Sequence, residues 1–227
     1  MVRRRAAVIE NLKGMMKMAQ SITPALVVVN MQEDYAKSEQ FDIGELSWKI
    51  SELMKNRYFG TVVAIQQWYP ENHVSFAESH RSFSEMDTIS VHGRPLTLMR
   101  RHCVSGTDGA KLLQALPWTR ANAVIRTGMD PGIATYSAFR EGWNERAEQP
   151  TTGLGGYLRS RGISEVYLVG LFREFSVLRS AEDGNSIGFS MHVIWDGTKA
   201  LEKEKDDEVR RALRVRGVKI IECGDLM

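Results

Sequence analysis

The sequence predicts an α/β fold: a mostly parallel, Rossmann-like sheet of about six strands in a three-layer α/β/α sandwich. Short apolar runs rich in Val, Ile and Leu alternate along the chain with longer segments of helical periodicity. Runs that are apolar throughout indicate parallel strands buried on both faces. The 227 residues, of which 43% are hydrophobic, are enough for one such domain with a full core.

The expected elements alternate along the chain. Strands are expected at residues 24–30, 60–65, 121–126, 165–169, 191–195 and 218–222, and helices at residues 43–58, 154–161, 176–187 and 202–216. Residues 71–109 lack a strong periodicity, and a loop of that length in a compact domain is usually functional. No apolar run approaches the roughly 18 residues of a membrane span. Cys103 and Cys223 lie far apart, which indicates a reducing compartment rather than a disulfide scaffold.

The segment 164–195 is the centre of this pattern. A buried strand ends near Gly170, a turn follows, and Ser176 opens the next helix. In an open α/β sheet, sites form where the chain leaves the carboxyl ends of the strands. The start of a helix also offers free N–H groups and the positive end of the helix dipole. A cysteine there would be a thiolate nucleophile, whereas this sequence has Ser176.

Residues 1–23 form a basic amphipathic arm in front of the domain, which spans residues 24–227. Apolar residues recur in the arm at helical spacing, and its basic residues outnumber one acidic residue, Glu10. The basic residues are Arg3, Arg4, Arg5, Lys13 and Lys17. Three interpretations stay open: a mitochondrial targeting segment, an anchor that contacts RNA or a protein partner, and a helix packed on its own domain.

Five segments in the same order resemble the isochorismatase/nicotinamidase family of cysteine hydrolases, and they imply its hydrolase fold. The segments are ALVVVNMQEDYA (25–36), QQWYPENHVSFA (66–77), RHCVSGTDGAKL (101–112), VIRTGMDPGIATYSAF (124–139) and VYLVGLFREFSVLRSAEDGNSIGFSMHVIWDGTKAL (166–201). They are similar to the family's Asp-Met-Gln strand end, its Asp-Trp-His-Pro loop, its His-Cys-Val stretch, its Lys-Gly…Tyr-Ser-Ala-Phe segment and its cysteine turn.

The resemblance implies an aspartate base, a lysine and a cysteine nucleophile. The base position carries Asn30, whose amide cannot take up a proton. We assign the lysine position to Arg126 and the nucleophile position to Ser176. A hydroxyl needs an adjacent base, and the candidates are Glu174, Asp34 and His102.

For nicotinamidases the resemblance also implies a metal held by Asp, His and His. The corresponding positions carry Gln67, Tyr69 and His102. One imidazole cannot hold a metal that needs three protein ligands. We therefore expect no metal and no cofactor.

From these substitutions we expect a degenerate, non-catalytic member of the family, a pseudoenzyme that serves as a structural or assembly subunit of a larger complex. The arm favours a mitochondrial ribonucleoprotein, such as a ribosome or ribosome-assembly particle, over a cytoplasmic setting. Two alternatives stay open. One is a divergent amidohydrolase that uses Ser176, and the other is a regulator that holds a small anion between Arg126, Arg173 and the Ser176 helix start.

Overall fold

The computed structural model describes residues 23–36 and 43–226. Six strands form one sheet, in which every neighbouring pair is parallel. The strands are β1 (Ala25–Val29), β2 (Thr61–Gln67), β5 (Ala123–Thr127), β6 (Glu165–Leu171), β7 (Ser190–Lys199) and β8 (Lys219–Ile221). Their order is β5-β2-β1-β6-β7-β8, so the first strand of the chain lies in the middle of the sheet. The predicted fold class is confirmed.

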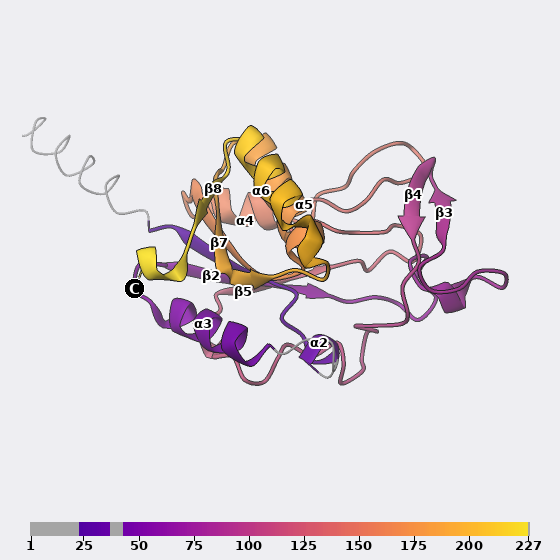
Figure 1. The fold of residues 1–227 in the computed structure, drawn as a ribbon, viewed down its shortest axis with the longest axis horizontal. Coiled ribbons are helices and arrows are strands. Elements are labelled where there is room, and N and C mark those ends of the chain that lie inside the picture. The colour runs from indigo at the N-terminus through magenta and orange to yellow at the C-terminus, as the bar shows by residue number, and fades with distance from the viewer. Residues whose placement is uncertain (1–22, 37–42, 227) are drawn as a thin grey trace, which may run out of the picture.

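Helices cover both faces of this sheet (Figure 1). On one face, α3 (Gly44–Lys55) packs the buried side chains of Leu46, Ile50, Leu53 and Met54 onto the sheet. The other face carries α4 (Leu154–Ser160), α5 (Leu178–Ser186) and α6 (Asp206–Val215). The central strand β1 is apolar at all five positions because both of its faces are covered. Within the described residues, no helix is long and apolar enough to cross a membrane.

Two small elements that the sequence did not predict lie outside the sheet. One is the short helix α2 (Glu33–Ala36), directly after β1. The other is a hairpin of β3 (Thr88–Val91) and β4 (Arg94–Thr97), which projects at one end of the molecule (Figure 1). Its two-residue turn is His92-Gly93, and both residues have positive φ, as a tight hairpin turn requires. The segment 71–109 is therefore partly structured.

Short helical turns fill the remaining connections. They are the 3-10 turns η1 (Ala77–Ser79), η2 (Trp118–Arg120), η4 (Lys203–Lys205) and η5 (Cys223–Asp225), and the π-helical turn η3 (Arg173–Val177). The basic arm that the sequence predicts, apart from Thr23, lies outside the described residues. Its helix, its role in targeting and its contacts stay predictions.

Candidate active site

The candidate site lies where the carboxyl ends of β1 and β6 meet. Asn30 follows β1 directly, and Ser176 lies in the turn after β6. The Asn30 side chain donates a hydrogen bond from Nδ2 to the Ser176 Oγ over 3.0 Å. Only 2% of Asn30 and 6% of Ser176 is exposed. Two residues that lie 146 positions apart in the sequence thus form one buried polar pair.

Gly170 lets the two strand ends come this close. A side chain on Gly170 would place its Cβ 2.1 Å from the carbonyl oxygen of Val29, and the residue has a φ of +110°. Only glycine meets both conditions without strain. Asn30 itself has a φ of 54°, in the left-handed region that asparagine enters more readily than most residues. The backbone conformations of Gly170 and Asn30 therefore allow the side chains of Asn30 and Ser176 to meet.

Ser176 does not open a helix, as the sequence predicted, but lies inside the single π-helical turn Arg173–Val177. The Val177 N–H donates to the carbonyl of Phe172 over 3.0 Å, which closes this wider turn. The α-helix α5 begins two residues after Ser176. Single π-turns are frequent at functional sites because they displace one residue from regular helical geometry.

The Ser176 hydroxyl has Asn30 as its hydrogen-bond partner within the described residues. An amide orients a hydroxyl but does not take up its proton. The expected candidate bases form hydrogen bonds with other groups. Glu174 accepts hydrogen bonds from the backbone of Leu201 and Glu202, Asp34 accepts one from the Cys103 N–H over 2.6 Å, and His102 Nδ1 contacts the carbonyl of Arg100.

Arg126 was assigned to the family's lysine position, and that assignment is wrong by one residue. In the Lys-Gly pattern the lysine directly precedes the glycine, and Thr127 precedes Gly128. The structure shows the consequence: Arg126 is exposed, stacks over Trp68 at 3.8 Å and donates to Gln66 over 3.3 Å. Thr127, which alternation along β5 directs to the opposite side, is 3% exposed. The sequence signal that would have identified Thr127 is the glycine after it.

The expected anion pocket of Arg126, Arg173 and Ser176 is not formed. Arg126 belongs to the edge strand β5, which β2 and β1 separate from β6. The Arg173 guanidinium is bound by Thr198, Asp206 and the carbonyl of Trp195. The two arginine side chains have different partners, so they do not converge on one ligand.

Aromatic residues fill the place to which the resemblance assigns a metal. The Tyr35 hydroxyl donates to Gln67 Oε1, and the Tyr69 ring packs 5.2 Å from the His102 ring and 5.5 Å from Phe76. Burial raises the pKa of the Tyr35 and Tyr69 hydroxyls well above the ordinary value, so neither becomes a phenolate ligand at neutral pH. Burial also lowers the pKa of His102.

These residues do not fit a divalent metal. The carboxamide of Gln67 already accepts the Tyr35 proton, and His102 is the one imidazole among the three positions. No group of three or more His, Cys, Asp or Glu side chains with metal-binding geometry exists within the described parts of the chain. Zinc sites of this kind need three protein ligands, so we derive no catalytic step through a metal.

His73, beside Tyr69, makes the fold sensitive to acid. Its Nδ1 accepts from the Ser75 N–H and its Nε2 donates to the carbonyl of Ile133, which requires the neutral ring. Burial lowers its pKa to about 4. The unfolded chain binds the proton near pH 6.5, so stability is lost as pH falls from about 6.5 to 4, by about 3 kcal/mol for this group.

We expect His73→Gln to flatten this pH dependence of the unfolding free energy, which urea titrations at pH 7.5, 6, 5 and 4.5 measure. Part of the slope will remain, because burial also lowers the pKa of His102 and His192. Equal slopes in both proteins would contradict the assignment to His73.

Comparisons with known proteins place this geometry in a family. Residues 24–224 match the model of the isochorismatase domain. The chain belongs to the isochorismatase family. It is 36% identical over 189 residues to a nicotinamidase of Acinetobacter baylyi. The aligned region covers 82% of this chain and 86% of that protein.

Solved structures agree with this assignment. The nicotinamidase/pyrazinamidase of Acinetobacter baumanii superposes with a TM-score of 0.83 at 32% identity, over 92% of this chain and all of the other. PnC1 from L. infantum in complex with nicotinate superposes with a TM-score of 0.77 at 30% identity, over 91% of this chain and 96% of that one.

These relatives contradict the expectation of a non-catalytic structural or assembly subunit. Relatives that match most of this isochorismatase-family chain are named as nicotinamidases, which are enzymes. That expectation is wrong, and the substitutions at the site must be interpreted in the context of a hydrolase family.

Proposed function

We propose that this chain is a serine-dependent amidohydrolase that converts a small aromatic carboxamide of the nicotinamide class into its carboxylate and ammonia. The family membership of residues 24–224 and the nicotinamidase relatives support this reaction class. The observation that carries the proposal is the 3.0 Å hydrogen bond between Asn30 and the Ser176 hydroxyl at the meeting point of β1 and β6.

In this reaction the Ser176 Oγ attacks the amide carbon and forms an acyl-enzyme, and water then releases the acid. Asn30 orients the hydroxyl through Nδ2. Because no carboxylate contacts that hydroxyl within the described residues, its proton passes to water or to the departing amide nitrogen. A hydroxyl without an adjacent base is a weak nucleophile, so we expect slow turnover.

The test is release of ammonia from nicotinamide by the purified chain over hours, compared with Ser176→Ala. We expect Ser176→Ala to lower the rate to that of buffer alone, a loss of about tenfold or more because the hydroxyl is the attacking group. Ser186→Ala is the matched control, since Ser186 is an exposed serine at the end of α5 whose hydroxyl donates to the carbonyl of Asp183. Equal rates for wild type and Ser176→Ala would refute the proposal.

A further inference from the structure

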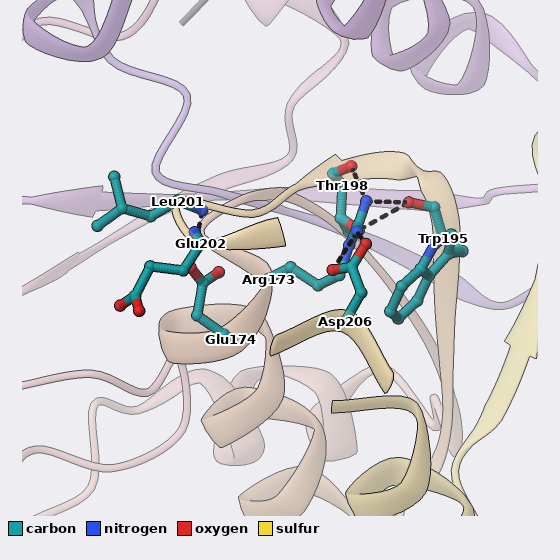
Figure 2. A network of polar contacts seen from close by, with 7 residues as sticks. All are labelled: Arg173, Glu174, Trp195, Thr198, Leu201, Glu202 and Asp206. Carbon is teal, nitrogen blue, oxygen red and sulfur yellow. Dashed lines mark hydrogen bonds and ion pairs between the residues drawn. The ribbon is translucent and has the colours of Figure 1, made fainter. Parts of the chain in front are cut away.

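Arg173 is almost completely buried three residues before Ser176, and its guanidinium is fully engaged (Figure 2). Its Nε donates to Thr198 Oγ1 over 2.8 Å, and Nη1 donates to both oxygens of Asp206 over 2.6 and 2.7 Å. Its Nη2 donates to the carbonyls of Thr198 and Trp195 over 2.7 and 3.2 Å. A buried guanidinium needs such compensation, since an unpaired one would be strongly unfavourable.

One of the two carbonyls that bind Arg173, that of Trp195, belongs to an irregular stretch of β7. The pairing of β6 with β7 shifts register between Leu168 and Gly170, so that Leu168 faces Val193 while Gly170 faces Thr198. The residues between them include Trp195, which contributes a carbonyl to Arg173. Bulges of this kind re-aim groups next to functional sites. Here the bulge presents the Trp195 carbonyl to Arg173 in the turn that carries Ser176.

The first turns of α6 close the network from the other side. Asp206 and Arg210 lie four residues apart on α6, so they share one face of the helix. Asp206 binds Arg173, and Arg210 stacks on the Trp195 ring at 3.7 Å while Arg173 stacks on it at 3.9 Å. The Trp195 ring therefore links two arginines, one from the turn and one from α6.

Glu174 adds a second tether between this turn and the chain before α6. Its Oε1 accepts from the backbone N–H of Leu201 over 2.7 Å and of Glu202 over 2.6 Å (Figure 2). Two consecutive residues of the π-turn are thus fixed to residues 195–206. The turn holds the hydroxyl that must meet Asn30, so these tethers act on the position of that hydroxyl.

We propose that Arg173, held by Asp206, is a positioning residue for Ser176, and that the start of α6 thereby sets the orientation of the nucleophile. The kinetic part of this inference rests on the proposed function, whereas the geometric part does not. A residue that served only the stability of the fold would leave the chemistry of a folded variant unchanged.

The first experiment compares Asp206→Asn with Asp207→Asn. Both remove one charge from the first turn of α6, but Asp207 is exposed and is not among the partners of Arg173. We expect Asp206→Asn to lower kcat by about tenfold with KM unchanged, because small displacements of a reacting atom have effects of this size. Asp207→Asn should behave as wild type. Asp206→Glu keeps the charge and should recover part of the lost kcat. If Asp206→Asn does not fold, Asp206→Glu takes its place in the comparison with Asp207→Asn.

The second experiment does not depend on turnover. In a Ser176→Cys background, the rate of alkylation by iodoacetamide across pH 6–10 reports the position and ionisation of the introduced thiol. We expect Asp206→Asn to slow this reaction about fivefold or to move its pH midpoint upward. The reason is that a thiol displaced from the turn loses the surroundings that favour its thiolate form. The unsubstituted protein measures the background from Cys103 and Cys223, both of which are buried.

The two experiments separate the two proposals. An effect on alkylation without any amide turnover in the wild type would support the positioning role and refute the hydrolase. Alkylation and kcat that are the same in Asp206→Asn and Asp207→Asn would overturn the positioning role.

Discussion

Replacing Asn30 with aspartate is expected to raise kcat for amide hydrolysis by a factor on the order of 10²–10³. The Asn30 Nδ2 lies 3.0 Å from the Ser176 Oγ, so a carboxylate of the same shape would accept the hydroxyl proton directly. General-base catalysis by a positioned side chain contributes about 10²–10⁴-fold. Ammonia release from nicotinamide by wild type and Asn30→Asp measures the gain.

The pH dependence of Asn30→Asp identifies the new base. Residue 30 is buried, and burial disfavours the charged carboxylate and raises its pKa. The variant should therefore lose activity as pH falls through this raised pKa, whereas the wild type has no carboxylate on Ser176 to protonate. The same buried charge should lower the melting temperature, because an uncompensated buried carboxylate is destabilising.

Asn122→Asp is the control for added charge. Asn122 is exposed, and its side-chain oxygen accepts from the Val62 N–H, an interaction that aspartate keeps. It should leave kcat unchanged. A folded Asn30→Asp variant with no gain over wild type would show that the hydroxyl is not the attacking group.

The sheet could be predicted because burial on both faces leaves a plain sequence signal. Every residue of β1 and β2 is buried, and each strand contains an apolar run that favours few alternatives. The hairpin of β3 and β4 lacks that signal. Its strands have four residues each. No residue of β3 is fully buried, Leu96 is the one buried residue of β4, and β4 includes Pro95, a residue that strands seldom contain.

The site was harder to predict because its geometry depends on register. The positions of Asn30 and Ser176 follow from motifs, but their contact depends on the approach that Gly170 allows. Arg126 shows how sharply register matters: an error of one residue along β5 exchanges a buried threonine for an arginine on the opposite side. The partners of Arg173 come from a bulge and a helix far along the chain, and no local pattern marks them.

The second large effect is expected on zinc affinity, at the positions to which the family resemblance assigns a metal. Gln67→Asp combined with Tyr69→His should create zinc binding that the wild type lacks, with an affinity gain of about a thousandfold or more. The double variant would place one carboxylate and one imidazole beside His102, which gives the three protein ligands that zinc sites require. Removing the tyrosine ring also frees space, because this ring packs against Gly128 so closely that a Cβ there would lie 2.2 Å from Tyr69 Cε1.

Calorimetric titration with ZnCl₂ at pH 7.5 and the shift in melting temperature measure this binding without reference to activity. The triple variant that adds His102→Ala should lose it, since two ligands do not suffice. Zinc binding by the wild type that is abolished by His102→Ala would contradict the interpretation. It would mean that Gln67 and Tyr69, despite the hydrogen bond from Tyr35 and the raised phenol pKa, still leave a metal site. The expected result would instead show that two side chains, Gln67 and Tyr69, are enough to prevent metal binding in an otherwise unchanged fold.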